Sequence, residues 1–525
     1  MVIGHNKKYT LDNIYQGHDE PVHFEEALVK AGRGWFHLKL QLVCGICLMS
    51  TIVEMLSTGY VLPSAECDLG ISTQLKGIVN AIAFLGMLFS SHLWGFLADT
   101  KGRRKILILT LVMDGLCTVL SSLSHHVWLL MVFRFFNGFF ICGSAAVLFA
   151  YLGEFHSEVN RARAIVWLGV FVALGTISLP GLAWLVIPLD LNLWLPWGPY
   201  YSWRLFLVLC AVPSLTAALL FATVLPRSPK FLLVSGKHQE AVDVLSNMFA
   251  ANTGKSADQY PVKAIQMDSQ PRRESVLAAP PVANVKSARE LFKNMLHQTL
   301  PLFRPPYLVN TLLACLLDFA IFSCANGFQL WLPELFNRVS QYTALHPGHD
   351  LTMCEMVHAL VNHTAQEEEP RCSNDVDSEV FQNTLIIGGA TALAYILAGY
   401  LVPHLGKRNV LISSMVTSGL GGIVLYFMRS PDSVLALSCI FVGLSTMCVS
   451  VVNSIVVDLF PTQLRAMAVC LSLMCGRLGT IVGSLVVGQL LELSCGAVFF
   501  VLSGIILGCG FMGFLIPRSS TISLA

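Results

Sequence analysis

Five ionisable side chains lie inside long apolar runs of this 525-residue sequence: Glu54, Asp114, Arg134, Asp318 and Arg477. A charge at the centre of a lipid bilayer costs several kcal/mol unless it is paired or hydrated. In membrane segments such residues form ion pairs, carry protons or bind charged substrates. These five residues are therefore candidates for substrate binding and ion coupling.

Helix rise places these charges at two depths. Glu54 lies eight residues, about 12 Å, inside the outer end of the first run, and Arg134 lies seven residues, about 10 Å, inside the outer end of the fourth. Asp318 and Arg477 lie twelve and eleven residues into the seventh and eleventh runs, about 17–18 Å deep and near the midplane. Glu54 thus shares a layer with Arg134, and Asp318 shares one with Arg477.

The elements that carry these residues are twelve apolar runs. Apolar residues make up 54% of the chain and charged residues 12%, about half the ~25% of soluble domains, and ~20 apolar residues span a bilayer as a helix. We expect an all-α membrane protein with twelve transmembrane helices in two six-helix bundles. The runs are about 39–62, 77–97, 105–124, 127–152, 163–187, 202–225, 306–332, 381–403, 408–428, 433–457, 466–490 and 495–516. The parts are a tail 1–38, a bundle 39–225, a linker 226–305 with short helices, a bundle 306–516 with an outer loop 334–380, and a tail 517–525.

Two motifs recur 304 residues apart, which indicates a duplicated unit. Gly95 opens a basic turn after the second run and Gly399 opens a degenerate copy after the eighth, where Pro403 replaces the acid of the first copy. A second acid–arginine pair recurs at the same distance. We expect weak ion pairs, ~0–1 kcal/mol each, to close the inner face, with Asp99 accepting from helix amides or pairing with Arg104. The gate candidates are Gly95, Asp99, Gly102, Arg103, Arg104, Glu154, Arg161, Asp458 and Arg465.

Basic residues concentrate in alternate short loops, which predicts that both termini and the linker are cytosolic. The acidic loop 334–380 then faces outside or a lumen, where Asn362 begins a glycosylation sequon. Cys354 and Cys372 lie in this polar loop and could form a disulfide if it faces an oxidising space. The first 38 residues contain no apolar signal segment, so we expect no cleaved leader.

The two six-span halves and the basic turn after span two resemble the major facilitator superfamily. Glu154-x6-Arg161 and Pro226-Arg-Ser-Pro229 resemble its sugar-porter and organic-ion-transporter branches. Val61-Leu-Pro-Ser-Ala-Glu66-Cys-Asp68 and Tyr201-Ser-Trp-Arg204 are similar to the synaptic vesicle glycoprotein 2 group. The loop 334–380 is much shorter than the large lumenal domain typical of the neuronal members of that group.

The resemblance implies a central cavity lined by spans one and four. Glu54 and Arg134 would then pair at its outer side, as in proton-coupled sugar porters, and protonation of Glu54 would release Arg134. Asp318 would face the substrate, with Arg477 pairing with it or with an anionic group. Trp167 and Trp331 would form aromatic walls. The alternatives are static structural pairs and ordinary packing, and Asp114, in a peripheral span, is expected to be structural.

Other functions lack supporting motifs. The sequence has no Walker motif, no metal-ligand spacing and no catalytic constellation, so we expect no enzyme activity, cofactor or metal. The net charge of +1 predicts no nucleic-acid partner. We expect a monomeric secondary transporter of a small organic ion or polar metabolite, with protons as a candidate coupling ion. It would act by alternating access in the plasma membrane or in secretory or synaptic-type vesicles. The alternative is a transporter-like receptor or vesicle protein that does not transport.

Overall fold

The computed structural model describes residues 22–189, 191–195, 198–266, 299–345, 351–357, 376–460 and 462–516. Within these ranges twelve helices are long and apolar enough to cross a membrane, as predicted. The N-terminal six are α2 (Trp35–Leu69), α3 (Thr73–Lys101), α4 (Arg103–Ser122), α5 (Val127–Gly153), α6 (Glu158–Val186) and α7 (Ser202–Thr223). The C-terminal six are α11 (Leu308–Gln329), which continues into α12 (Leu332–Leu345), α14 (Ser378–Leu405), α15 (Lys407–Phe427), α16 (Pro431–Leu459), α17 (Thr462–Leu493) and α18 (Cys495–Met512).

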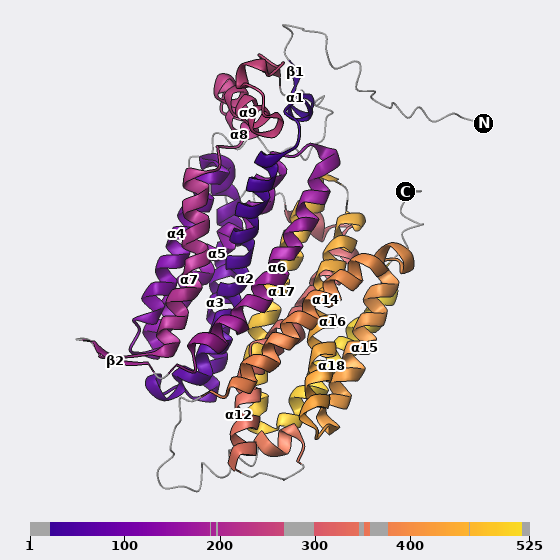
Figure 1. The fold of residues 1–525 in the computed structure, drawn as a ribbon. Helices are drawn as coiled ribbons and strands as arrows, with labels where there is room; N and C mark the ends of the chain where they lie inside the picture. Colours follow the sequence, from indigo (N-terminus) through magenta and orange to yellow (C-terminus); the bar gives the residue numbers. More distant parts are fainter. Residues whose placement is uncertain are drawn as a thin grey trace.

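The two sets of helices form two bundles that lie side by side, here called the N-half and the C-half (Figure 1). In each half, the duplicated basic turn ends a helix at a glycine, and the two glycines occupy equivalent positions of the repeat. Gly102 follows α3 with φ of 93°, and Gly406 follows α14 with φ of 80°. Residues with a Cβ atom rarely adopt such φ angles, so a glycine at this position lets the chain turn directly into α4 and α15.

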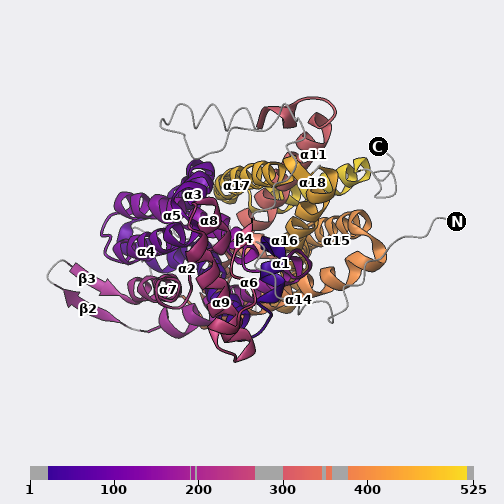
Figure 2. The same cartoon turned by 90° about the horizontal axis from the view of Figure 1, so that it is seen from above.

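A small folded unit covers one end of the N-half (Figures 1 and 2). It contains α1 (Phe24–Lys30), α8 (Pro229–Val234), α9 (His238–Thr253), η2 (Ala257–Gln259) and the parallel pair β1 (Val22–His23) and β4 (Ile265–Gln266). We call this the linker end of the molecule. The opposite, loop end carries α12 and the hairpin of β2 (Asn192–Leu195) and β3 (Gly198–Tyr201).

The N-terminal segment packs on the linker helices, because its apolar face shares their core. Phe24, Ala27 and Leu28 are buried in one apolar cluster with Leu245 and Met248 of α9. The sequence predicted short helices in the linker 226–305 and a polar tail up to residue 38. The structure places α8 and α9 in that linker and begins the first span at Trp35.

Among the described residues, most of the core that the halves share lies toward the loop end. Val61 and Ala65 near the end of α2, and Ala183 near the end of α6, belong to the same apolar cluster as most of the buried C-half. The cluster at the linker side contains N-half and linker residues, with Leu330 as its only buried C-half member among the described residues. The structure is therefore closed between the halves at the loop end and separated at the linker end.

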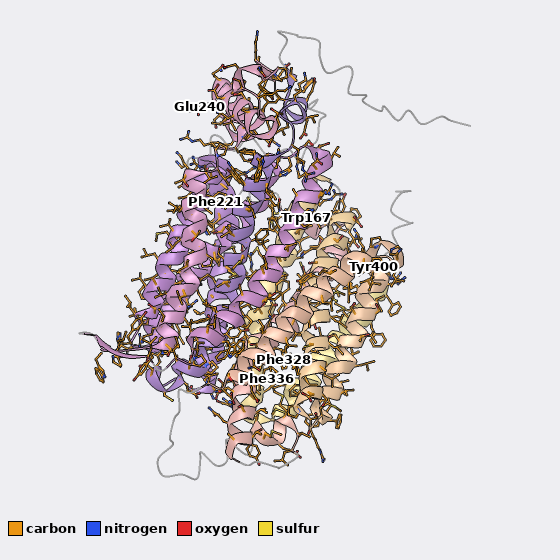
Figure 3. The ribbon with its side chains drawn as sticks, viewed as in Figure 1. Trp167, Phe221, Glu240, Phe328, Phe336 and Tyr400 are labelled. Carbon is orange, nitrogen blue, oxygen red and sulfur yellow. A yellow bond between two sulfur atoms is a disulfide. The ribbon has the colours of Figure 1, made fainter. Side chains whose placement is uncertain are left out.

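Two pairs of aromatic residues mark the two ends of the bundles. Trp167 on α6 is 55% exposed and Tyr400 on α14 is 67% exposed, both in the linker-side parts of their helices. Phe328 and Phe336, toward the loop end, are buried, and Figure 3 shows the two pairs at opposite levels of the molecule.

Candidate functional site

A cluster of polar side chains is buried inside the N-half, among α2, α4, α5 and α7. None of its members is more than 1% exposed. We call it the N-half polar cluster. Its members are Glu54, Ser57, Asp114, Thr118, Arg134, Asn137 and Ser214.

The structure brings Glu54 and Arg134 together, and equal depth in the membrane was the signal that suggested it. Arg134 Nη1 lies 3.5 Å from Glu54 Oε2 and donates to Ser57 Oγ at 3.0 Å. Glu54 Oε1 and Arg134 Nη2 find no hydrogen-bond partner within the described residues. The pair is therefore held by one nitrogen and one oxygen, and each group keeps a second atom free.

Asn137 connects this pair to a second acid. Its Nδ2 lies 3.2 Å from Glu54 Oε2, 2.7 Å from Asp114 Oδ1 and 2.9 Å from Thr118 Oγ1. An amide has only two N–H groups, so it can satisfy two of these three acceptors at once. Ser214 Oγ donates to Asp114 Oδ2 at 2.7 Å.

Sequence reasoning missed Asn137, Thr118 and Ser214, and it treated Asp114 as structural in a peripheral span. A usable signal was present. Asn137 lies three residues after Arg134, and such residues share a helix face. Thr118 has the same relation to Asp114, four residues later.

The cluster contains two carboxyl groups and one guanidinium. With both acids ionised it carries one uncompensated negative charge in an apolar interior, which is expensive. One bound proton makes the cluster neutral. Its composition is therefore suited to binding and releasing a proton.

The predicted position of the pair was wrong. We expected Glu54 and Arg134 at the outer side of a cavity between the halves, but both lie within the N-half and neither is exposed. The reason is the direction of the side chains. They point toward Asp114 on α4 and Ser214 on α7, helices that pack against each other inside this half.

Asp318 and Arg477 do not pair, contrary to one of our predictions. Asp318 is fully buried in α11, and neither of its oxygens has a hydrogen-bond partner within the described residues. Arg477 reaches into the N-half, where Nη1 donates to Ser91 Oγ at 2.7 Å and to Cys142 Sγ at 3.1 Å.

The prediction of an Asp318–Arg477 pair was wrong because depth in the membrane does not determine which way a side chain points around the helix axis. The face of α17 that meets α11 carries glycine. A Cβ atom on Gly479 would lie 2.0 Å from the Phe319 carbonyl oxygen, and one on Gly476 would lie 2.7 Å from the Phe322 ring. Arg477 follows Gly476 by one residue, about 100° around the helix, and so faces α3.

The two tryptophan candidates lie apart. Trp331 is buried immediately before α12, and its Nε1 donates to the Ser484 carbonyl at 3.1 Å. Trp167 projects from the exposed linker-side part of α6 (Figure 3). Of the six predicted substrate and coupling residues, the structure brings together only Glu54 and Arg134. The two tryptophans do not line a common cavity in this conformation.

The basic motif of the N-half is held together within that half. Arg103 contacts both Glu154 and Asp99, the latter at 3.3 Å. Arg104 donates to the carbonyl groups of Phe221 and Ala222 at 2.8 and 2.6 Å. Of the two roles predicted for Asp99, the pair with Arg104 is wrong, because Arg104 binds the carbonyl end of α7, where a cation is favourable. Gly95 has open space around it, and Gly102 forms the turn.

The contacts of the remaining gate candidates do not join the two halves. Arg161 contacts Glu25 at 3.2 Å, and the same carboxylate accepts from the Glu158 amide at the start of α6. Asp458 contacts Lys407 at 2.6 Å. Arg465 Nε is buried with no partner within the described residues. A network between the halves is thus absent from the described residues at this separated end, which is where we expect it to form when the end closes.

The predicted disulfide partner was wrong. Cys354 is bonded to Cys495, with Cα atoms 5.3 Å apart. We had placed Cys495 within an apolar run, but it is the first residue of α18 and therefore lies at the loop end. Cys67 at the end of α2 is disulfide-bonded as well. Cys372 and the sequon residue Asn362 lie outside the described residues.

Comparisons with known proteins agree with this architecture. The family model of the Major Facilitator Superfamily matches residues 42–355 and 381–523. Synaptic vesicle glycoprotein 2B of Homo sapiens is 24% identical over 590 aligned residues, which cover 94% of this chain and 85% of that protein. Synaptic vesicle glycoprotein 2A of Rattus norvegicus is 35% identical over 236 residues, 44% of this chain and 31% of that protein.

Two solved structures share the fold. The xylose transporter of E. coli in a partially occluded inward-open conformation superposes with a TM-score of 0.64 at 15% identity, covering 92% of this chain and 100% of that one. A D-xylose–proton symporter superposes with a TM-score of 0.65 at 14% identity, covering 93% and 99%.

Proposed function

Because the chain belongs to the major facilitator superfamily, we propose that it is a secondary transporter that moves a small organic ion or polar metabolite by alternating access, coupled to protons. The observation that carries the proposal is the N-half polar cluster, in which two buried acids are joined through Asn137 and, within the described residues, only Glu54 forms an ion pair with Arg134. A buried cluster with a surplus acid is unusual unless that acid is used. Intramembrane charges are functional by default.

Alternating access is supported by the relation between the halves. They share a core toward the loop end and separate toward the linker end. This arrangement corresponds to one of the two states that such a transporter must visit. The ion pairs of the basic motifs, Arg103–Glu154 and Lys407–Asp458, each stay within one half, which supports movement of each half as a unit.

Protonation would act through Arg134. When Glu54 is ionised it holds the guanidinium at 3.5 Å, and when Glu54 takes up a proton that attraction is lost. Arg134 then depends on Ser57 of α2 alone, or turns toward Asp114. A proton shifts a conformational equilibrium only if it binds the two states differently, and rearrangement of this pair supplies such a difference.

The substrate is proposed to carry an anionic group. Arg477 lies where α17 meets the N-half, and its partners Ser91 and Cys142 are neutral. It has no carboxylate partner within the described residues. A guanidinium without a counterion, between two moving halves, would attract a carboxylate or another anion from a substrate.

The loop end is proposed to face the outside or a lumen, and the linker end the cytosol. The Cys354–Cys495 disulfide supports this assignment, because structural disulfides persist in oxidising compartments. The basic residues of the turns lie at the other end, as the positive-inside rule expects. The plasma membrane and a secretory or synaptic-type vesicle both fit this orientation.

The test is uptake by the purified full chain in proteoliposomes, with a mixture of organic anions and an imposed proton gradient. We expect gradient-driven uptake by the wild type, loss of the gradient dependence in Glu54→Gln, and normal dependence in Asp243→Asn, a control on α9 far from the cluster. Uptake by Glu54→Gln with unchanged proton dependence would refute the coupling role. Absence of uptake by a correctly folded wild type would favour the transporter-like receptor or vesicle protein.

A further inference from the structure

Four charged side chains meet between the halves at the loop end, and the sequence had suggested none of them. Glu66 belongs to α2 and Lys76 to α3, both in the N-half, and Glu334 and Arg338 belong to α12 in the C-half. We call them the loop-end quartet. Lys76 is almost completely buried, although it is a lysine near the start of a helix.

Lys76 is held by one acid from each half. Its Nζ lies 2.7 Å from Glu66 Oε2 and 2.7 Å from Glu334 Oε1. Glu334 also accepts from Arg338 Nε at 2.8 Å within its own helix, and Arg338 Nη2 crosses to Thr73 Oγ1 at 3.1 Å. The side chains of Lys76 and Glu334 are 1% and 5% exposed, so their bond is sealed from water.

Tight packing beside the quartet shields the Lys76–Glu334 bond from water. A Cβ atom on Gly59 would lie 2.8 Å from the Leu330 carbonyl oxygen of the other half, and one on Gly488 would lie 2.9 Å from the Trp331 ring, which itself packs near Gly77. Backbones approach closely where the halves meet. Excluding water lowers the local dielectric, which strengthens the Lys76–Glu334 attraction while the halves are together.

The charges of the quartet balance in each half separately. The N-half supplies Glu66 and Lys76, and the C-half supplies Glu334 and Arg338. If the halves part, Lys76 can keep Glu66 and Glu334 can keep Arg338, so neither half is left with an unpaired charge. Breaking a buried ion pair is severely unfavourable mainly because one partner is left uncompensated, and here that penalty is avoided.

We propose that the loop-end quartet is a reversible gate in which Lys76–Glu334 holds the loop end closed and Glu66 and Arg338 stabilise the open state. The inference rests on the proposed alternating access. The proposal assigns Glu66 and Glu334, which bind the same lysine, opposite effects on the equilibrium between the closed and the open loop end. Loss of Glu334 weakens the closed state, whereas loss of Glu66 removes the partner that Lys76 needs when the gate is open.

The test measures the distance between the halves at the loop end. Spin labels on a bio-orthogonal amino acid at Leu123 and Leu493, exposed residues of the two halves near this end, report it by double electron–electron resonance on the full chain in nanodiscs. We expect a short and a long distance in the wild type. Glu334→Gln should raise the ratio of long to short by at least about threefold, and Glu66→Gln should lower it by a similar factor.

The outcomes separate the gate from the function on which it rests. Glutamine keeps the size of glutamate, so a general loss of packing would move both variants in the same direction, and that result would overturn the gate. Two wild-type distances that neither substitution changes would also overturn it, while leaving alternating access intact. A single short distance under all substrate and pH conditions would refute alternating access, and the gate with it.

Discussion

Asn137 is the residue on which the N-half polar cluster depends, because its amide nitrogen lies within hydrogen-bond distance of both acids. Without it, Asp114 would keep Ser214 and Glu54 would keep Arg134, but the link between the two acids would be lost. The cluster would then become two separate sites rather than one proton-sharing unit.

Removing this donor should reduce stability. We expect Asn137→Ala to lower the free energy of unfolding by about 2–4 kcal/mol, because several buried acceptors lose their partner and a small cavity is left. Thermal unfolding followed by scanning fluorimetry in detergent measures the effect. The matched control is Asn409→Ala, an exposed asparagine bonded to the Leu405 carbonyl, which should change stability by less than about 0.5 kcal/mol. Equal effects of the two substitutions would contradict a central role for Asn137.

The second acid of the cluster makes a separate prediction. Asp114→Asn preserves size but leaves one acid and one arginine, so the cluster is neutral without a bound proton. We expect uptake by this variant to depend more weakly on the proton gradient than wild-type uptake does, with transport itself retained. The measurement is initial uptake rate against external pH in proteoliposomes. A pH profile that coincides with the wild-type profile would show that Asp114 is a structural residue only.

At the scale of elements, the N-terminal segment is built into the linker end. The Asn252 side chain on α9 donates to the Ala31 and Gly32 carbonyl groups at 3.1 and 3.0 Å and accepts from the Phe36 amide at 3.1 Å. Tyr260 donates to the Ala27 carbonyl at 2.7 Å. The turn into α2 is therefore fixed by a segment more than two hundred residues away in the sequence.

His156, in the turn between α5 and α6, makes this region sensitive to pH. Its burial lowers its pKa from 6.5 to about 4, helped by the positive charges of Arg33 and Arg161 and by His37, whose ring centroid is 4.8 Å away. The unfolded region would bind a proton below pH 6.5 that the folded one refuses. Stability is therefore complete above pH 6.5 and declines as the pH falls toward 4, by up to about 1.4 kcal/mol per pH unit.

Hydrogen exchange measured by mass spectrometry tests this dependence. After correction for intrinsic rates, amides of α1 and α9 should lose protection between pH 7.5 and pH 4.5 in the wild type. His156→Asn, which keeps a donor for the Leu152 carbonyl, should weaken the dependence, and substitution of the exposed His238 by Gln should not. Equal protection of the wild type at both pH values would contradict the prediction.

At the scale of the whole molecule, glycines set how closely the halves approach. A Cβ atom on Gly388 of α14 would lie 2.6 Å from the Thr176 carbonyl oxygen of α6. The neighbouring Gly389 has nothing within 4 Å of that position. Gly388 therefore lies at the contact between the halves, and Gly389 serves as a matched control for a glycine-to-alanine change on the same helix.

We expect Gly388→Ala to push α6 and α14 apart and to destabilise the state that is closed at the loop end, while Gly389→Ala leaves the equilibrium unchanged. The distance between labels at Leu123 and Leu493 should become longer in the first variant only. Both substitutions raise helix propensity equally, so a difference between them reports the contact. A Gly388→Ala variant with the wild-type distance distribution would show that the contact can relax without moving the helices.

The sequence predicted the coarse architecture because bilayer thickness and duplication act on long stretches of chain. The twelve spans followed from run length, and the two halves followed from motifs 304 residues apart. Individual contacts were less predictable. Depth brought Glu54 to Arg134 correctly but suggested a false Asp318–Arg477 pair, because rise along a helix says nothing of rotation about its axis.

Long-range partners were also beyond the sequence. Cys354 had a nearby cysteine in the same polar loop, and only the packing of the C-half shows that Cys495 is its partner. Lys76 looked like an ordinary residue near the start of a helix, and its role depends on α12 from the other half. Such contacts depend on the angle between the halves, which no local pattern records.

The contact of Glu25 with Arg161 and the Glu158 amide has a mechanical consequence. It fastens the chain ahead of the first span to the tip of α6, the helix whose other end meets α14. In the proposed transporter, a partner or modification that displaced the N-terminal residues would also displace α6. It would thereby change the rate of exchange between the two states without binding at the substrate site.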